Sequence, residues 1–336
     1  MNDIWVQSLY VRNGKGYVLK NKLSIIIPTY NRWDVLIRTL ENTLANNWAG
    51  VSVIVLDNDS NPDGREALLD VMEKYHSVPC RIQKNTVNIG GDGNIIRCIE
   101  ICETPYVLVL GDDDFLSSDY LEKISRYLMA DVNWGYISFR DCVYEGKDEV
   151  FASPVEMVES CGDWSKLLFI STTIFNTKMF CEGMQAAQRA QVTHSSHLVG
   201  MIKGWERSAV NENTWKFLLS AQQLVVSGGH ARDHRSFELM SIYAGFPILE
   251  FIFQDKRTHY AVRKAIRGAT KRMFKPRVLA KEFYYFTLQF GFEAAWRRMV
   301  AMRRGLSYSI GWRALFYRAY LPLVVIITAG ISPLIN

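Results

Sequence analysis

The sequence lacks the usual marks of a secreted or membrane-spanning protein. Its six cysteines form no CxxC pair, which favours free thiols in a reducing compartment. Its amino terminus has no basic segment followed by a long apolar run, so no secretory signal is predicted. The apolar stretch 321–335 is shorter than the roughly 20 residues that a membrane-spanning helix needs. These absences predict a cytoplasmic protein.

The charge is distributed unevenly along the 336 residues. Residues 255–336 contain 16 Lys and Arg but only three acidic residues, a net charge of +13, whereas the whole chain carries +5. The first 254 residues are therefore acidic, with a net charge of −8. This division predicts an acidic body and a basic appendage that meets an anionic partner, either nucleic acid or a membrane surface.

Short apolar segments alternate with amphipathic ones in the first third of the chain. Strands are predicted near residues 23–27, 51–56, 81–83 and 106–110, and helices near 34–47, 62–75, 94–102 and 118–130. Apolar strands separated by helices predict an α/β fold whose mainly parallel sheet is covered by helices on both faces. Ligands of such sheets bind beyond the carboxyl ends of the strands. After Gly135 the pattern is irregular, with strand-like segments at 136–139, 168–175 and 224–226.

Three consecutive carboxylates, Asp112, Asp113 and Asp114, directly follow the buried strand 106–110. Adjacent carboxylates repel one another, so a folded chain that keeps them together needs a nearby positive charge. Mg²⁺ or Mn²⁺ would supply this charge and would also hold a diphosphate. The structural alternative is a solvated acidic turn before a helix that Ser118 caps. The run predicts a metal and diphosphate site.

Polar clusters follow the other predicted strands, and each also has a plain structural interpretation. Asn31 with Asp34 fits a helix cap after the first strand. Asp57 fits an Asx turn after the second. The glycine-rich loop 88–94 precedes a helix, but Ile96 stands where a dinucleotide fingerprint needs its third glycine. Each cluster alone is unspecific.

Taken in this order, the segments 27–32, 57–60, 88–90 and 110–114 resemble glycosyltransferase family 2. The resemblance covers about residues 22–135 and implies a GT-A fold and inverting transfer from a nucleoside-diphosphate sugar. It implies that Asp113 contacts the donor sugar in catalysis, and that Asp114 and Asp112 bind Mn²⁺ or Mg²⁺. The implied nucleotide-binding residues are Pro28, Thr29, Tyr30, Asn31, Asp57, Asn88, Gly90 and Asp112.

Gly111 departs from the family pattern, because many members have Asp at this position. The departure therefore favours Asp113 and Asp114 as the residues that contact the metal and the donor sugar.

Inverting transfer needs a general base, which family members usually carry in an acidic pair that this chain lacks. The corresponding stretch, 193–198, resembles that of bacterial O-antigen sugar transferases and predicts His197 as the base. Asp141 and Glu206 are rivals, and a packed histidine is the structural alternative. His234 lies in a segment that resembles the family's Arg-x-His and implies a further metal ligand.

The basic region interleaves Arg and Lys with aromatic residues from 256 to 318. Basic, aromatic-rich amphipathic helices fit an anionic membrane surface. Alternatively, they pack on the catalytic body or on another subunit, which would make the protein a homo-oligomer. No nucleic-acid-binding module is visible, so nucleic acid is not an expected partner.

The sequence therefore predicts a transferase at the inner face of the cell membrane, with a polyprenyl-diphosphate-linked saccharide as acceptor, in bacterial surface polysaccharide synthesis. Residues 1–240 would form the catalytic domain, with a nucleotide-binding half (22–135) and an acceptor half (136–240), and residues 241–336 the basic membrane-associating region. One alternative is a non-catalytic sugar-nucleotide-binding or scaffold protein. Another is a sugar nucleotidyltransferase, which would need a glycine-rich basic loop where 28–31 stand.

Overall fold

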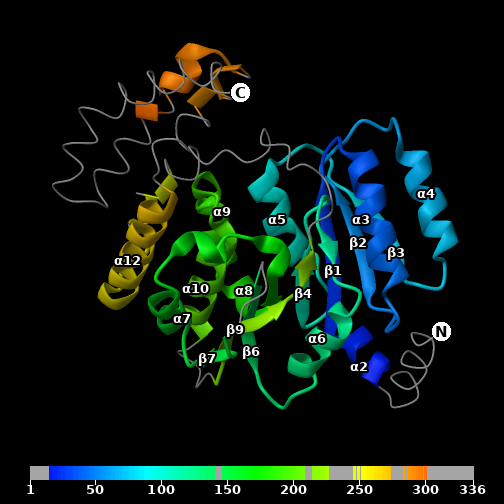
Figure 1. Ribbon diagram of the computed structural model, residues 1–336, viewed down its shortest axis with the longest axis horizontal. Helices are drawn as coiled ribbons and strands as arrows, with labels where there is room; N and C mark the ends of the chain where they lie inside the picture. The colour runs from blue at the N-terminus through cyan, green and yellow to red at the C-terminus, as the bar shows by residue number, and fades with distance from the viewer. Residues whose placement is uncertain are drawn as a thin grey trace. The chain divides into compact units, whose positions relative to one another are not determined.

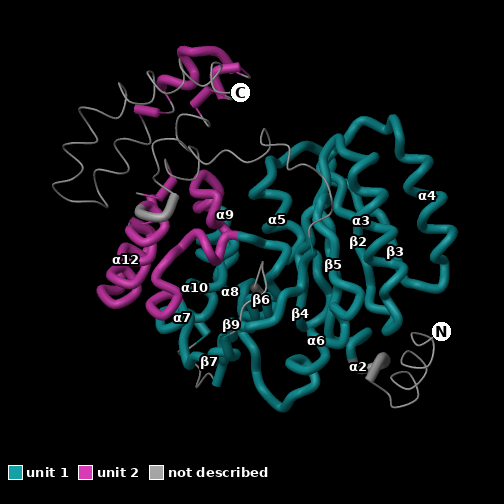
Figure 2. Tube along the Cα trace, in the orientation of Figure 1, with its two compact units in different colours: residues 1–157, 169–188, 197–230 teal, residues 158–168, 189–196, 231–336 magenta. Residues whose placement is uncertain are grey.

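The computed structural model describes residues 15–140, 146–208, 214–226, 245–273 and 283–300, apart from 247, 250, 285, 289 and 298. The chain divides into two compact units (Figure 2). The first comprises residues 1–157, 169–188 and 197–230, and the second residues 158–168, 189–196 and 231–336. The second unit is thus discontinuous in sequence.

The first unit is built on an eight-stranded sheet with the order β3-β2-β1-β4-β8-β6-β9-β7 (Figure 1). Its strands are β1 Leu23–Thr29, β2 Ser52–Asp57, β3 Cys80–Lys84, β4 Tyr106–Val109, β6 Trp134–Arg140, β7 Glu149–Phe151, β8 Thr173–Asn176 and β9 Lys216–Gln223. The strands β1 to β4 are parallel, as are β6 and β9, whereas β8 and β7 run antiparallel to their neighbours. A separate ribbon pairs β5 Phe115–Leu116 with β10 Val225–Val226. The predicted mainly parallel α/β fold is confirmed.

Helices lie against both faces of this sheet. The described helices up to residue 208 are α2 Lys15–Lys22, α3 Trp33–Ala45, α4 Arg65–Lys74, α5 Gly91–Glu100, α6 Tyr120–Leu128, α7 Pro154–Cys161, α8 Thr177–Glu182, α9 Met184–Arg189 and α10 Ser196–Ser208. Ile25 and Ile27 of β1 join a buried cluster with apolar residues of α3, α4 and α6. Ile26 lies outside that cluster and is buried too, on the side where α5 contacts β1 and β4. A strand buried on both faces explains its continuous apolar run.

The segment predicted as a strand over 168–175 is different in the structure. Two short 3₁₀ helices, η1 Trp164–Leu167 and η2 Ile170–Thr172, precede the four-residue strand β8. The Thr172 and Thr173 hydroxyls donate back to the carbonyls of Phe169 and Ile170, at 2.8 and 2.6 Å. Such local hydrogen bonds offer the backbone an alternative to the strand ladder. The change matters because η2 carries Ser171.

The second unit contains α12 Lys256–Met273, which packs on η1. Its buried side is small and apolar, with Ala261, Ala265 and Ala269 fully buried. A side chain at Gly268 would meet the carbonyl oxygen of Gly162, so glycine is required at this close approach. The helix is basic, and its described residues are buried on one side and exposed on the other. Within the described ranges, no helix is both long enough and apolar enough to cross a membrane.

Candidate functional site

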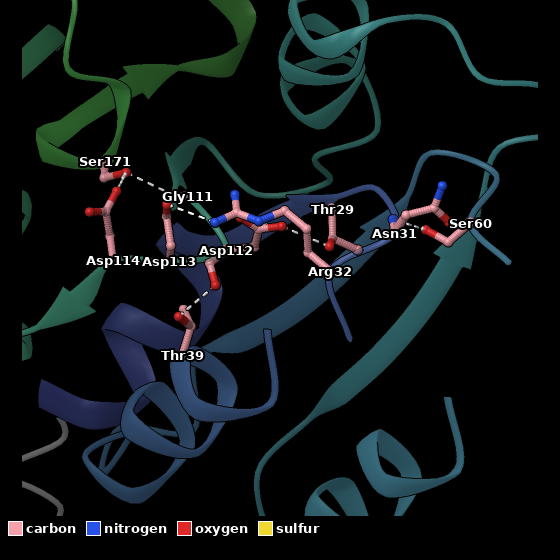
Figure 3. Close-up of polar contacts among 10 residues, drawn as sticks. All are labelled: Thr29, Asn31, Arg32, Thr39, Ser60, Gly111, Asp112, Asp113, Asp114 and Ser171. Carbon is pink, nitrogen blue, oxygen red and sulfur yellow. Dashed lines mark hydrogen bonds and ion pairs between the residues drawn. The ribbon is translucent and has the colours of Figure 1, made fainter. Parts of the chain in front are cut away.

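The carboxyl ends of β1, β2 and β4 meet at one edge of the sheet. Thr29, the last residue of β1, lies opposite Asp57, the last residue of β2. On the other side of β1, the amide of Leu110 donates to the carbonyl of Ile26 at 3.0 Å and extends the pairing toward the acidic run. The motifs that follow three separate strands therefore lie together (Figure 3).

Asp112 is fastened to this edge by both of its carboxylate oxygens. Oδ2 accepts a hydrogen bond from the Thr29 hydroxyl at 2.8 Å, and Oδ1 accepts one from Arg32 at 2.7 Å. The side chain is 7% exposed. Burial raises the pKa of Asp112 to about 6, although the Arg32 charge and the Thr29 hydrogen bond act in the opposite direction. Thr39 of α3 also donates to the Asp112 carbonyl, at 2.8 Å.

Arg32 bridges two of the three carboxylates. Its second terminal nitrogen donates to Asp113 Oδ2 at 2.9 Å, and its side chain is 37% exposed. Burial by itself would lower the pKa of Arg32, but attraction to Asp112 and the hydrogen bond to Asp113 raise it. The chain therefore supplies part of the positive charge that the acidic run needs, a role that the sequence pattern did not reveal.

Asn31 turns the chain so that Arg32 reaches the acidic run. Its φ is +53°, in the left-handed region where Asn is better tolerated than most residues. Its amide donates to Ser60 Oγ, and its side-chain oxygen accepts from the amide of Asn61, both at 2.8 Å. Arg32, not Asn31, occupies the N-cap position of α3 and makes no side-chain cap hydrogen bond. The interpretation of Asn31 as a helix cap was wrong.

The β2 loop and Tyr30 flank this turn. Asp57 is buried, and its Oδ1 accepts a hydrogen bond at 2.8 Å from the amide of Ser60, three residues on, so its carboxylate stabilises the turn after β2. Pro28 lies within β1 opposite Leu56. Tyr30 is 45% exposed just beyond the strand. The roles of Pro28, Tyr30 and Asp57 in nucleotide binding stay predictions.

A network of asparagines organises the loop before α5. Asn88 Oδ1 accepts hydrogen bonds from Asn58 Nδ2 and from the amide of Gly90, both at 2.8 Å. Asn58 Oδ1 accepts one from Asn85 Nδ2 at 3.0 Å. Gly90 has a φ of +80°, which favours glycine at this N-cap position of α5. Asn58 and Asn85 link β2, β3 and α5, and sequence spacing gave no sign of these links.

Asp114 is held by a residue that the sequence analysis did not single out. The hydroxyl of Ser171 donates to Asp114 Oδ2 at 2.6 Å and accepts from the amide of Gly111 at 2.8 Å (Figure 3). Ser171 is 57 positions further along the chain. It lies in the segment that was predicted to be a strand, so no motif marked it.

The predicted general base lies away from these contacts. His197 of α10 is 2% exposed and packs edge-on against Phe175, with ring centroids 6.3 Å apart. Phe175 pairs with Val107 of β4, before the acidic run begins. Glu206 forms an ion pair with Lys203 at 2.6 Å. Asp141 and His234 lie outside the described residues. The identity of the base stays a prediction.

The arrangement of the carboxylates indicates which of them suit a divalent cation at this edge of the sheet. Nowhere in the described ranges do three or more His, Cys, Asp or Glu side chains form a group that could hold a metal ion. Carboxylate oxygens are the hard donors that Mg²⁺ and Mn²⁺ prefer, and Mg²⁺ is commonly bound by one or two carboxylates plus substrate phosphates. Asp113 and Asp114 fit such a shared site better than Asp112, which directs both oxygens to protein donors.

We expect Asp112 to give the metal-free protein a distinctive dependence of stability on pH. Its folded-state pKa lies above its usual value of 3.8, so the fold favours the protonated form. This contribution is present below about pH 4 and is lost as the pH rises through about 6. Asp112→Asn should therefore reduce the loss of unfolding free energy between pH 4 and 7 by about 2 to 3 kcal/mol. Urea unfolding in EDTA measures it.

Asp119 provides a matched control for this experiment. Desolvation alone would raise the pKa of Asp119, but hydrogen bonding and attraction to Lys123 lower it. The stability that Asp119 contributes is therefore present above about pH 4 and is lost only at lower pH, so Asp119→Asn should leave the change between pH 4 and 7 nearly unaltered. Identical pH slopes for the wild type and Asp112→Asn would contradict the burial of an ionisable Asp112.

A mainly parallel sheet with an acidic turn at the carboxyl end of β4, beside the end of β1, is typical of proteins of the GT-A class. Residues 24–181 match the domain model of glycosyl transferase family 2. This region of the chain, 158 of its 336 residues, is therefore similar to glycosyl transferase family 2.

Two bacterial relatives illustrate the sequence similarity. The chain is 32% identical over 109 residues to abequosyltransferase RfbV of Salmonella typhimurium, over 32% of each chain. It is 22% identical over 254 residues to the Escherichia coli UDP-Glc:alpha-D-GlcNAc-diphosphoundecaprenol beta-1,3-glucosyltransferase WfaP, over 70% of this chain and 98% of that protein. The match thus spans about a third of the Salmonella protein.

Solved structures share the fold at low sequence identity. Residues 1–349 of S. aureus TarS superpose with a TM-score of 0.55 and 13% identity, over 92% of this chain and 89% of that one. The mannosyltransferase PcManGT of Pyrobaculum calidifontis, in complex with GDP-Man and Mn²⁺, has a TM-score of 0.50 and 12% identity, over 98% and 96%. Identities this low support the fold alone.

Proposed function

We propose that the protein is an inverting, metal-dependent glycosyltransferase that moves a sugar from a nucleoside-diphosphate sugar to a saccharide acceptor. The observation that carries this proposal is the acidic turn, where Asp112, Asp113 and Asp114 lie against the ends of β1 and β4 in a family 2 domain. Charge develops on the diphosphate as the glycosidic bond breaks. With a bound divalent cation between them, the acidic turn would be where the chain holds that diphosphate.

The residues at the carboxyl ends of β1, β2 and β4 have different roles in this proposal. Asp114 and Asp113 would hold Mn²⁺ or Mg²⁺, which as a Lewis acid would stabilise the departing diphosphate. Asp113 also contacts the donor sugar. Thr29 and Arg32 keep Asp112 and Asp113 oriented through their hydrogen bonds of 2.7 to 2.9 Å. Tyr30, exposed at the edge, offers a face for the nucleotide base, and the buried Asp57 shapes the loop beside it.

The acceptor hydroxyl attacks the anomeric carbon opposite the departing diphosphate, and a general base takes its proton. His197 is our proposed base. Because His197 is 2% exposed and packs against Phe175, this role requires a rearrangement that uncovers the imidazole. The kcat of His197→Asn as a function of pH tests it, since loss of the base removes the acidic limb of the profile.

Two measurements test the proposed function. Calorimetric titration with UDP, GDP, CDP and TDP, each with and without Mn²⁺, should show metal-dependent binding of one of them. A screen of sugar nucleotides with lipid extract as acceptor should then show transfer. Metal-dependent binding without transfer or hydrolysis would instead support a non-catalytic sugar-nucleotide-binding protein. Absence of nucleotide binding would overturn both.

We further propose a polyprenyl-diphosphate-linked acceptor, as in the synthesis of a bacterial surface polysaccharide such as an O-antigen. The proposal is supported by the name of the E. coli relative, which specifies a diphosphoundecaprenol acceptor and aligns over 98% of its own length. Such an acceptor lies at a membrane, so the enzyme must work at that surface. Replacing the lipid extract by the same glycan without lipid tests this, because transfer should then fall.

The outer face of α12 is suited to an anionic membrane surface. Its exposed side chains in the described part of the helix are Lys256, Arg257, Tyr260, Lys264 and Arg267. Four cations and one aromatic ring at helical spacing form one stripe, which we name the α12 basic face. Positive charge near an anionic leaflet contributes about 1 kcal/mol per Lys or Arg. We propose that the α12 basic face lies on the inner leaflet.

Reversing two charges of the α12 basic face should release the protein from anionic vesicles. Lys256→Glu with Lys264→Glu should weaken binding to phosphatidylglycerol-containing vesicles about 30-fold or more, because two attractions become repulsions. Arg65→Glu with Lys74→Glu on α4 changes the net charge equally and should have a small effect. Sedimentation with vesicles measures both. Equal losses in the two variants would show that net charge, not this face, governs binding.

A further inference from the structure

Ser171 joins the acidic turn to a distant part of the chain. It lies in η2, directly before β8, and is fully buried. A serine hydroxyl can donate only one hydrogen bond, so of the two described contacts of Ser171 Oγ one is donated and the other is accepted. The proton is donated to Asp114 Oδ2 at 2.6 Å, while the oxygen accepts from the amide of Gly111 at 2.8 Å. The orientation of the Asp114 carboxylate is therefore fixed from outside the acidic run.

Gly111 provides the space for this arrangement. A Cβ atom at position 111 would lie 2.7 Å from Asp114 Oδ2 and 3.1 Å from Ser171 Oγ. The amide of Asp114 also donates to the Gly111 carbonyl at 3.2 Å, which closes the turn. Any larger residue at 111 would displace the Asp114 carboxylate from Ser171. The glycine that departs from the family pattern is thus required by the position of Asp114.

We propose that Ser171 is a positioning residue for Asp114, which it holds in the orientation that binds a divalent cation, and that Gly111 is the partner that permits it. The inference rests on the proposed function, in which Asp114 is a metal ligand. Residues that orient metal ligands through hydrogen bonds typically change metal affinity by about 10- to 100-fold when they are removed. A carboxylate that is held in advance also loses less rotamer freedom on binding.

The test measures Mn²⁺ affinity by electron paramagnetic resonance, for Mn²⁺ alone and with the nucleoside diphosphates. Ser171→Ala should weaken Mn²⁺ binding about 10- to 100-fold. The matched control is Thr172→Ala, which removes a neighbouring hydroxyl of η2 that donates to the Phe169 carbonyl at 2.8 Å. That control should leave the Mn²⁺ affinity unchanged.

A second variant covers the outcome in which Ser171→Ala fails to fold. Gly111→Ala leaves the serine in place but moves the Asp114 carboxylate, and should weaken Mn²⁺ binding in the same direction. Unchanged Mn²⁺ affinity in Ser171→Ala or Gly111→Ala, with binding lost in Asp114→Ala, would overturn this inference alone. Equal weakening by Ser171→Ala and Thr172→Ala would also overturn it. Wild-type protein that binds no Mn²⁺ would overturn the proposed function as well.

Discussion

Replacing Asp114 by alanine should abolish metal-dependent nucleotide binding and reduce glycosyl transfer by about 100- to 1,000-fold. Asp114 is the carboxylate that Ser171 orients at the end of β4, and in the proposed function it carries the cation that neutralises the diphosphate. Removing one preorganised electrostatic contact to developing charge typically costs two to three orders of magnitude in rate. Calorimetry with Mn²⁺ and the nucleoside diphosphate, followed by initial rates, measures both effects.

Asp114→Asn separates the charge of this side chain from its shape. The amide keeps the size and one oxygen acceptor, so the contact with Ser171 can survive while the negative charge is lost. We expect the Asn variant to lose metal binding nearly as completely as the Ala variant, but to remain as stable as the wild type. Retained Mn²⁺-dependent binding in both variants would refute the assignment of Asp114.

Replacing Arg32 by alanine should destabilise the metal-free protein and at the same time strengthen its binding of Mn²⁺. In the wild type, the Arg32 guanidinium lies 2.7 Å from an Asp112 oxygen and 2.9 Å from an Asp113 oxygen. The variant leaves both carboxylates without this shared counter-charge. We expect the unfolding free energy to fall by about 1 to 3 kcal/mol, less than for a fully buried pair because Arg32 is 37% exposed. The pKa of Asp112, which the Arg32 charge lowers, should rise further.

The gain in Mn²⁺ affinity follows from the same loss of positive charge. Without the guanidinium, the acidic turn attracts a divalent cation more strongly, by about tenfold. Mn²⁺ should therefore restore more stability to Arg32→Ala than to the wild type, as thermal unfolding with and without Mn²⁺ would reveal. Arg32→Lys keeps the charge and should lie between the two. Weaker Mn²⁺ binding by Arg32→Ala would show that Arg32 builds the cation site instead of competing with the cation.

Much of the first unit was predictable because its sequence signals are local. The continuous apolar runs of β1 and β4, and the helical spacing of Leu36, Leu40 and Leu44 in α3, report burial directly. The rule that ligands bind beyond the carboxyl ends of parallel strands then brought Thr29, Asp57 and the acidic run to one edge. The region from 164 to 176 was harder, because threonine hydroxyls stabilise 3₁₀ turns where β-branched residues favour a strand.

The sequence by itself determined the α/β class, the resemblance to glycosyl transferase family 2 and the three carboxylates of the candidate site. Only the tertiary structure decided how those carboxylates are used. It showed that Asn31 turns the chain and that Arg32 neutralises Asp112 and Asp113. It also showed that Ser171 donates a hydrogen bond to Asp114, and that Gly111 leaves the space for this contact. Apolar periodicity is a local property that can be read from neighbouring residues. A hydrogen bond between residues 57 or 80 positions apart depends instead on how strands and turns meet in space.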